Sequence, residues 1–337
     1  MITVIRKIVA ILCLLTLFFS LSLIYVDSGL TQVKQLADYP DQLTRDGELV
    51  ILPSHGTVYI GTDFHGKLHH FEQWLKQTAL IDKIYSENNV YGLILGDIVD
   101  HKLTEPIPDP NGDTKIVDQI RNFQKQLGSK GERLIYLKGN HELAATDTYA
   151  MLKKNGMNAH NRKHLIDLLY NSAQGSYFKQ FNFIERMTDE QYDYLVDLPV
   201  IAVGKNGMVA VHAGTSPSVM NIADLVKPSQ KTLNQLLWGR PSVAMANGYT
   251  TWQTQAFLKG IGGTLLIVGH TPLSYLPPEG IINGVSILNK QQLTFSTGYG
   301  AQPGVSSYLV IDLSKIYNSA LSLKYKSEIH PLFPPEQ

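Results

Sequence analysis

The chain has 337 residues, enough for one large domain or two small ones, and 44% of them are apolar. Its 29 basic and 29 acidic side chains cancel, which argues against general nucleic-acid binding because that function needs an excess of Lys and Arg. The apolar content argues against long disorder, and a disulfide scaffold is excluded because Cys13 is the only cysteine.

The first element expected in chain order is an apolar helix. Residues Ile8–Val26 carry no charged side chain, and Arg6 and Lys7 precede them. A run of this length can cross the roughly 30 Å hydrocarbon core of a bilayer. Because basic flanks stay in the cytoplasm, we expect the rest of the chain outside it, on the periplasmic side in a Gram-negative cell. Secretion after cleavage of a signal peptide is the alternative.

The remaining sequence divides without internal repeats. We expect a signal anchor or signal peptide in residues 1–27, a polar stalk in 28–54 with a first helix near Leu30–Tyr39, and one folded domain in 55–320. A helical insert within that domain is expected at about 145–195, and a C-terminal tail at 321–337.

A pattern recurs in the expected domain: a short apolar run is followed within a residue or two by Asp, Asn or His. Five such runs, which predict buried strands, precede Asp63, Asp97, Asn140, His212 and His270. Helical patterns at His70–Asn88 and Ile116–Leu127 separate the early runs, and this alternation is typical of an α/β sheet. Ligands bind at the carboxyl ends of the strands in such sheets, so we expect these side chains at one rim.

The side chains near these strand ends are typical of a metal site. They are two carboxylates, three imidazoles and one amide oxygen: Asp63, His65, Asp97, Asn140, His212 and His270. This set is too large for one tetrahedral zinc ion and suits Mn, Fe, Zn or Ni. It can hold two metal ions about 3.5–4 Å apart if one carboxylate bridges them, an arrangement used for phosphoryl transfer. A single Asp at such a place is more often a helix cap, but five such ends make coincidence a poor explanation.

Five motifs carry a resemblance to a known family. In chain order they are Asp63-Phe64-His65-Gly66, Gly96-Asp97-Ile98-Val99-Asp100, Gly139-Asn140-His141-Glu142, His212-Ala213-Gly214 and Gly269-His270-Thr271. Over about residues 55–315 the chain resembles the calcineurin-like metallophosphoesterases. The His-Ala-Gly form, and Thr271 after Gly-His, are similar to the phosphoprotein phosphatase branch, which includes the Shewanella-like bacterial phosphatases.

The resemblance implies an α/β fold of four layers, an α/β/β/α sandwich with two mixed sheets, here preceded by one N-terminal membrane helix. It implies two divalent metal ions, Mn, Fe or Zn. One ion would be held by Asp63, His65 and Asp97, and the other by Asp97, Asn140, His212 and His270.

The chemistry that the resemblance implies is hydrolysis of phosphomonoesters by in-line attack of a metal-bridging hydroxide. We expect His141 to protonate the leaving group, and Asp100 to orient the imidazole and favour its charged form. The alternative for His141 is a group that only positions the phosphate. Glu142 is expected to hold the loop by hydrogen bonds. The substrate would be a phosphorylated protein or small molecule, with no nucleic acid as partner.

One departure from the family pattern concerns the phosphate clamp. The family usually continues Gly-Asp-x-Val-Asp with Arg-Gly, and this Arg clamps the substrate phosphate, whereas this chain has His101 and Lys102. Imidazole forms no bidentate fork, and Lys acts only as a point charge. Arg240 matches the place of another phosphate-binding Arg of the family, with His101 and Lys102 as weaker candidates.

Two other functions stay open. A dinucleoside polyphosphate hydrolase, similar to the symmetrical diadenosine tetraphosphatases, would use the same motifs, although such nucleotides are mainly intracellular. A catalytically inactive, membrane-tethered binding protein is disfavoured because all expected metal ligands and His141 are present.

Overall fold

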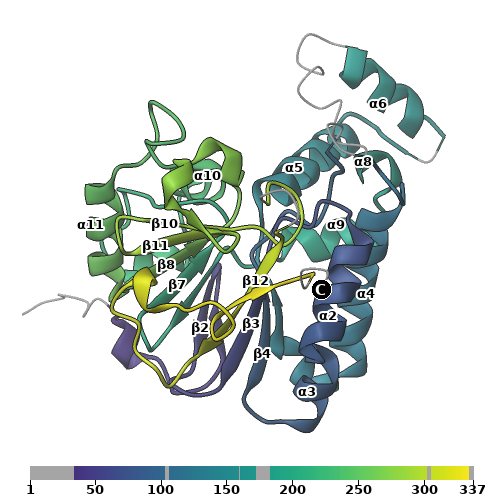
Figure 1. Ribbon diagram of the computed structural model, residues 1–337. Coiled ribbons are helices and arrows are strands. Elements are labelled where there is room, and N and C mark those ends of the chain that lie inside the picture. The colour runs from purple at the N-terminus through teal and green to yellow at the C-terminus, as the bar shows by residue number, and fades with distance from the viewer. Residues whose placement is uncertain (1–33, 103–105, 159, 172–182, 302–304, 334–337) are drawn as a thin grey trace, which may run out of the picture. The chain divides into compact units, whose positions relative to one another are not determined.

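The computed structural model describes residues 34–102, 106–158, 160–171, 183–301 and 305–333 (Figure 1). The chain divides into two units, Met1–Lys34 and Gln35–Gln337, and every element described below belongs to the second. The expected membrane helix at residues 8–26 lies outside the described residues. Within those residues, no helix has the length and apolar character that a membrane span needs.

The first sheet has five strands in the order β13-β12-β3-β4-β5. Their bounds are Thr57–Gly61 (β3), Val90–Ile94 (β4), Leu134–Tyr136 (β5), Ser307–Asp312 (β12) and Ile329–Pro331 (β13). β3, β4 and β5 are parallel, whereas β12 is antiparallel to both of its neighbours. The carboxyl ends of β3, β4 and β5 therefore share one edge, where the loops of Asp63, Asp97 and Asn140 begin.

The second sheet has eight strands in the order β1-β2-β6-β7-β8-β11-β10-β9. Their bounds are Thr44–Asp46 (β1), Leu49–Leu52 (β2), Ile201–Gly204 (β6), Met208–Val211 (β7), Leu265–Val268 (β8), Ile281–Ile282 (β9), Val285–Leu288 (β10) and Gln292–Phe295 (β11). β7 and β8 are parallel, so His212 and His270, which follow them, leave the sheet at the same edge.

The α-helices lie outside both sheets. Their bounds are Leu68–Thr78 (α2), Leu80–Ser86 (α3), Gly112–Gln126 (α4), Asn140–Lys154 (α5), Arg162–Asn171 (α6), Phe183–Arg186 (α8), Asp189–Val196 (α9), Gln230–Trp238 (α10) and Thr251–Ile261 (α11). Short 3-10 helices occupy Leu36–Asp38, Gly128–Arg133, Ile222–Leu225, Leu273–Tyr275, Pro278–Gly280 and Ala320–Ser322. Helices α5, α6, α8 and α9 lie in the region where the sequence predicts a helical insert.

Three apolar clusters define the layers. Phe71 and Trp74 of α2 and Ile116 of α4 pack on the five-stranded sheet, and helices α10 and α11 cover the eight-stranded sheet on its outer face (Figure 1). Between the sheets, Leu93 of β4 and Ile267 of β8 belong to one buried cluster. The order helix, sheet, sheet, helix agrees with the four-layer arrangement that the resemblance implies.

The structure differs from the expected stalk at residues 28–54. All four residues of β2 are buried, and the strand pairs in parallel with β6, placing Leu49 opposite Ile201. Within the described residues, the helix expected near Leu30–Tyr39 is only the 3-10 turn Leu36–Asp38. The expected tail differs too, because β13 pairs with β12. A four-residue apolar run is too short to show the periodicity that predicts a strand, and its pairing partner lies far away in the chain.

The single helical pattern at His70–Asn88 forms two helices that meet at Ala79. This residue has a left-handed backbone with φ 46°, and its N–H donates to the carbonyls of Leu75 and Lys76, which closes α2. The side chain of Ala79 is exposed, whereas that of the next residue, Leu80, is buried. The break therefore turns the chain so that α3 also packs on the sheet.

We predict that Ala79→Gly raises the free energy of unfolding by about 0.5–1 kcal/mol, because the left-handed region costs an L-residue roughly 1–2 kcal/mol and glycine avoids this. Gly262 closes α11 with φ 76°, and a Cβ there would meet no atom nearer than 3.9 Å, on Leu36. Gly262→Ala should therefore destabilise by a similar amount, without a clash. Urea unfolding measures the free energy of unfolding of both variants. If both are as stable as the parent protein, the backbone strain assigned to these two positions is wrong.

Candidate metal centre

The loops that follow the strands have an unusual backbone at the predicted site residues. Asp63, His65, Asp97, Asp100 and His270 all have positive φ, between 43° and 71°. Non-glycine residues adopt this region rarely, at a cost of roughly 1–3 kcal/mol each, and such residues gather at functional sites. Hydrogen bonds offset part of this cost. The N–H of His270 donates to both carboxylate oxygens of Asp63, at 3.1 and 3.0 Å.

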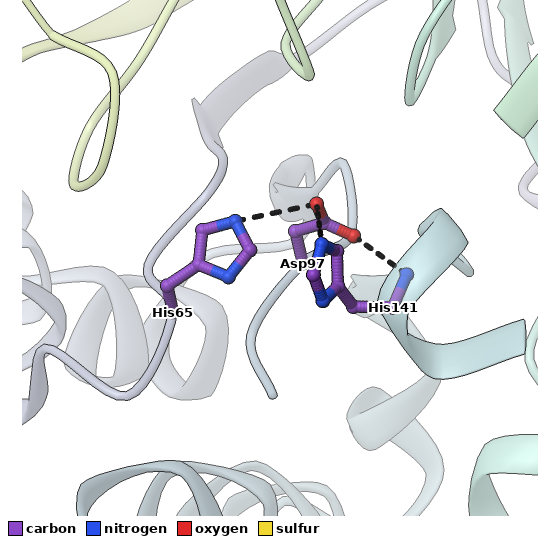
Figure 2. A group of neighbouring side chains, drawn as sticks. All are labelled: His65, Asp97 and His141. Atoms are coloured by element: carbon purple, nitrogen blue, oxygen red, sulfur yellow. Dashed lines mark hydrogen bonds and ion pairs between the residues drawn. The ribbon is translucent and has the colours of Figure 1, made fainter. Parts of the chain in front are cut away.

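Asp97 lies at the centre of the cluster. Its Oδ2 is 3.3 Å from Nε2 of His65 and 3.3 Å from Nε2 of His212. Figure 2 shows it between His65 and His141, and Nε2 of His141 is 3.9 Å away. His65 follows a strand of the five-stranded sheet and His212 a strand of the eight-stranded sheet. One carboxylate therefore faces ligands from both sheets, as a bridging ligand must.

His212 connects the other predicted ligands to this carboxylate. Its Nε2 lies 2.8 Å from Oδ1 of Asn140 and 3.2 Å from Nδ1 of His270. Among the described residues, two groups of three side chains are close enough to hold a metal ion, with ligand atoms within 4.8 Å of one another: His65, Asp97 and His141, and Asp97, His212 and His270. The two groups share Asp97.

Backbone carbonyls orient two of the imidazoles. Nδ1 of His65 lies 2.9 Å from the carbonyl of Asp100, and Nδ1 of His212 lies 2.8 Å from the carbonyl of Leu95. These contacts assign the proton to Nδ1, so that the Nε2 lone pair can bind a metal. His270 has a buried Nε2 without a hydrogen-bond partner among the described residues. A buried imidazole nitrogen without a partner fits a metal ligand.

The electrostatics of the cluster depend on the buried carboxylates. Burial raises the pKa of Asp63 to about 6. Burial lowers the pKa of His65 to about 4 and that of His270 well below its usual value. Burial also lowers the pKa of His212, but Asp97 and Asp63 outweigh it and raise the value to about 9. A protonated His212 thus balances the carboxylates, and its proton must leave before Nε2 can bind a metal.

Glu142 holds together the loops that carry Asp97 and Asn140, as the sequence predicts. Its carboxylate accepts hydrogen bonds from four backbone N–H groups and one phenol: Asp97 at 2.9 Å, Ile98 at 2.8 Å, Val99 at 3.2 Å, Gly139 at 2.8 Å and the hydroxyl of Tyr136 at 2.7 Å. The side chain is fully buried. One carboxylate therefore fixes the loops that carry Asp97 and Asn140.

The structure separates His101 from Lys102. Nζ of Lys102 lies 2.6 Å from Nε2 of His141 and 5.2 Å from the ring centroid of Tyr299. The ring of His101 is buried against Gly66, where an added Cβ would lie 2.2 Å from it, and its Nε2 is 3.7 Å from Asp113. His101, a candidate phosphate ligand in the sequence, therefore packs into the protein, whereas Lys102 points to the site.

Arg240 lies on the other side of the cluster. Its guanidinium stacks 5.6 Å over the ring of Tyr275, and its Nη1 is buried without a hydrogen-bond partner among the described residues. Its positive charge contributes to the lowered pKa of His270, after burial and His212. Sequence reasoning missed two aromatic neighbours, Tyr299 edge-on to His65 and Trp238 edge-on to His270. Neither residue lies in one of the five motifs. For Tyr299, the local feature that could have indicated a role in the site is the glycine on each side of it.

Comparison with known proteins identifies the family. The model of the calcineurin-like phosphoesterases matches residues 56–282, and the chain belongs to this family. A comparison with curated protein sequences found no match.

Several solved structures are similar to this chain at low sequence identity. A protein serine/threonine phosphatase from Saccharomyces cerevisiae, similar to human phosphatase PP5, has a TM-score of 0.52 at 14% identity, over 79% of this chain and 77% of that chain. A cold-active protein tyrosine phosphatase of a psychrophilic Shewanella species has a TM-score of 0.48 at 18% identity, over 81% and 79%. A putative diadenosine tetraphosphatase has 0.42 at 14%, over 78% and 93%. At these identities the likeness concerns the fold alone.

We predict that Glu142→Gln lowers the free energy of unfolding by about 2 kcal/mol or more, because the new amide N–H₂ faces backbone donors that lose an acceptor. The loops of Asp97 and Asn140 should then bind Mn²⁺ more weakly. Urea unfolding and titration calorimetry with MnCl₂ measure the two effects. Glu279→Gln, at an exposed position, is the matched control. Wild-type stability and Mn²⁺ affinity in Glu142→Gln would show that this carboxylate does not organise the centre.

Proposed function

We propose that the protein is a metal-dependent phosphatase that hydrolyses phosphomonoesters, including those of phosphorylated proteins. The observation that carries this proposal is the position of Asp97, whose Oδ2 lies 3.3 Å from imidazoles that follow strands of different sheets. A carboxylate placed in this way can bridge two metal ions, an arrangement suited to phosphoryl transfer. Membership of the calcineurin-like phosphoesterases supports the same reaction class.

Two divalent ions would be held as the motifs suggest, one by Asp63, His65 and Asp97 and the other by Asp97, Asn140, His212 and His270. Proximity among the described residues supports His65, Asp97, His212 and His270, whereas Asp63 is assigned from its motif alone. Mixed oxygen and imidazole donors suit Mn, Fe or Zn. When bound, such ions activate water for attack and neutralise the phosphate oxygens.

His141 is placed to protonate the leaving group. Nδ1 lies 2.7 Å from Oδ2 of Asp100, which fixes the ring and directs Nε2 towards Asp97. Burial lowers the pKa of His141 well below its usual value; Asp97 opposes this, and Lys102 adds to it. The contact with Asp100 supports the orienting role expected from the sequence, and that Asp100 favours the charged form stays a prediction. A phosphate dianion beside the ring would favour the proton on Nε2, from which it can pass to the leaving oxygen.

Two cations take the place of the family's clamping Arg. Lys102 donates towards Nε2 of His141 at 2.6 Å, and a substrate oxygen could replace the imidazole as its acceptor. Arg240 offers its buried Nη1, which has no hydrogen-bond partner in the described part of the chain. A point charge and a guanidinium from different sheets can neutralise the phosphate together, although neither is the arginine of the motif.

We predict release of phosphate from p-nitrophenyl phosphate by the purified full-length protein with Mn²⁺, Fe²⁺ or Zn²⁺. Asp97→Asn should abolish this activity, because the bridging charge is lost, while circular dichroism remains that of a folded protein. Phosphopeptides and diadenosine tetraphosphate in the same panel separate a phosphatase from a dinucleoside polyphosphate hydrolase. The proposal fails if none of these substrates is hydrolysed with any of the metals.

We predict that Arg240→Ala lowers kcat/KM for p-nitrophenyl phosphate at least tenfold, about 1.4 kcal/mol, because a donor to the phosphate is lost. Lys102→Ala should have an effect of similar size. Arg133→Ala is the matched control, since Arg133 bonds to the carbonyl of Glu87, away from the metal loops. Unchanged kinetics in Arg240→Ala would remove this residue from the phosphate site.

We also propose that the protein is anchored in the membrane and faces away from the cytoplasm. The support is the uncharged run Ile8–Val26 after Arg6 and Lys7. In cells that express the full chain, the protein should sediment with membranes, and external protease should digest it in spheroplasts. A protein that stays in the soluble cytoplasmic fraction would refute this location.

A further inference from the structure

A cavity of about 190 Å³ opens on the eight-stranded-sheet side of the molecule. Its walls come from the segment after β7, from α10, from the loop 239–249 and from the start of α11. Among the residues that line it are Thr215, Trp238, Arg240, Met245 and Tyr249.

Two residues of the cavity wall contact the motifs of the metal cluster. The ring of Trp238 stands edge-on to that of His270, with centroids 6.4 Å apart. The hydroxyl of Tyr249 donates to the carbonyl of Ala213 at 3.3 Å, and its ring lies where a Cβ on Gly214 would be, at 2.3 Å. Both contacts involve residues of the motifs of His212 and His270. The cavity therefore lies next to the motifs of His212 and His270.

The loop that closes the cavity is held in place by its own backbone. The N–H of Tyr249 donates to the carbonyl of Arg240, and the N–H of Ser242 to the carbonyl of Tyr249, each at 2.9 Å. Gln292 donates to the hydroxyl of Tyr249 at 2.8 Å. Little conformational freedom is lost when a ligand enters a cavity with such fixed walls.

Two polar groups in the wall lack hydrogen-bond partners among the described residues. They are Oγ1 of Thr215, whose residue is 2% exposed, and Nη1 of Arg240. Buried polar groups are nearly always satisfied in folded proteins, so each exception calls for an explanation, and a role in binding is one. No described residue that lines the cavity is acidic. An anionic group with acceptor oxygens is the chemistry that complements these walls.

We infer that the cavity is a substrate subsite for the carboxylate side chain of an Asp or Glu next to the phosphorylated residue of a peptide. This inference rests on the proposed phosphatase function. The volume is below the roughly 300–1,000 Å³ of sites that enclose drug-sized ligands, so it suits one side chain. Arg240 would bind the phosphate with part of its guanidinium and favour the neighbouring carboxylate through its charge.

The test uses phosphopeptide pairs that differ only in Glu or Ala beside the phosphorylated residue, on either side. The full-length protein with Mn²⁺ should favour one Glu peptide over its Ala twin by about fivefold or more, both in kcat/KM and in affinity measured by fluorescence anisotropy. Met245 lines the cavity and is 51% exposed, so its substitution leaves the core intact. Met245→Glu should remove the preference, and Met245→Lys at the same position should keep or enlarge it.

Two further variants complete the test. Ile316→Glu adds the same charge at the opposite end of the strands. The nearby Leu313 donates its N–H to the carbonyl of Gly56, which precedes β3, and Ile316 itself is 68% exposed. This variant should leave the preference unchanged. Thr215→Val removes the hydroxyl of the cavity wall and should lower the ratio of Glu to Ala peptide about threefold or more.

The outcomes separate the subsite from the phosphatase function. Turnover without a preference for Glu, or a preference that Met245→Glu leaves intact, overturns the subsite alone. Tighter binding of the Glu peptide that Met245→Glu abolishes, without turnover of any phosphorylated substrate, keeps the subsite and rejects the phosphatase. Equal binding of both peptides without turnover rejects both.

Discussion

Burial of the Asp97 carboxylate dictates how the surrounding side chains are arranged. A buried carboxylate is costly unless its charge is compensated and its oxygens are bonded. Here Oδ2 faces the imidazoles of His65 and His212, and Oδ1 accepts a hydrogen bond from the backbone N–H of His141. Burial raises its pKa, but His212 and His141 outweigh this and hold the pKa well below the usual value. Because the two imidazoles follow strands of different sheets, both sheets must end at the same place.

The loops around this carboxylate hold a strained backbone in one geometry. The left-handed conformations of Asp63, Asp97 and His270 direct their side chains inwards over very short stretches of chain. Glu142 stabilises the loop of Asp97 through its backbone N–H groups and is itself held by Tyr136 of β5. A polar network of this kind stabilises a site only if every member is satisfied. The hydrogen bonds to Glu142 therefore help to hold the strained loop of Asp97 in its conformation.

The balance of charge over the chain is consistent with a site whose positive charge is local. With 29 basic and 29 acidic side chains, the molecule offers no general attraction for a phosphate dianion. Lys102 reaches the cluster from the five-stranded sheet, and Arg240 reaches it from the side of the eight-stranded sheet. Metal ions in the cluster would supply the larger part of the charge. This division lets the protein stay nearly neutral and still bind an anion at one point.

The sequence alone predicts the residue types that gather in the cluster and the strands that lead to them, because each motif follows a local apolar run that can be recognised without a distant partner. Tertiary structure decided which strands complete the sheets: Leu49 pairs with Ile201, and Leu309 of β12 with Ile60, contacts between segments far apart in the chain. It also decided between two neighbours that the sequence left equal. The space beside Gly66 takes up the ring of His101, and this packing leaves Lys102 beside His141. Local pattern fixes which residues are available, whereas packing between distant segments fixes which of them reach the site.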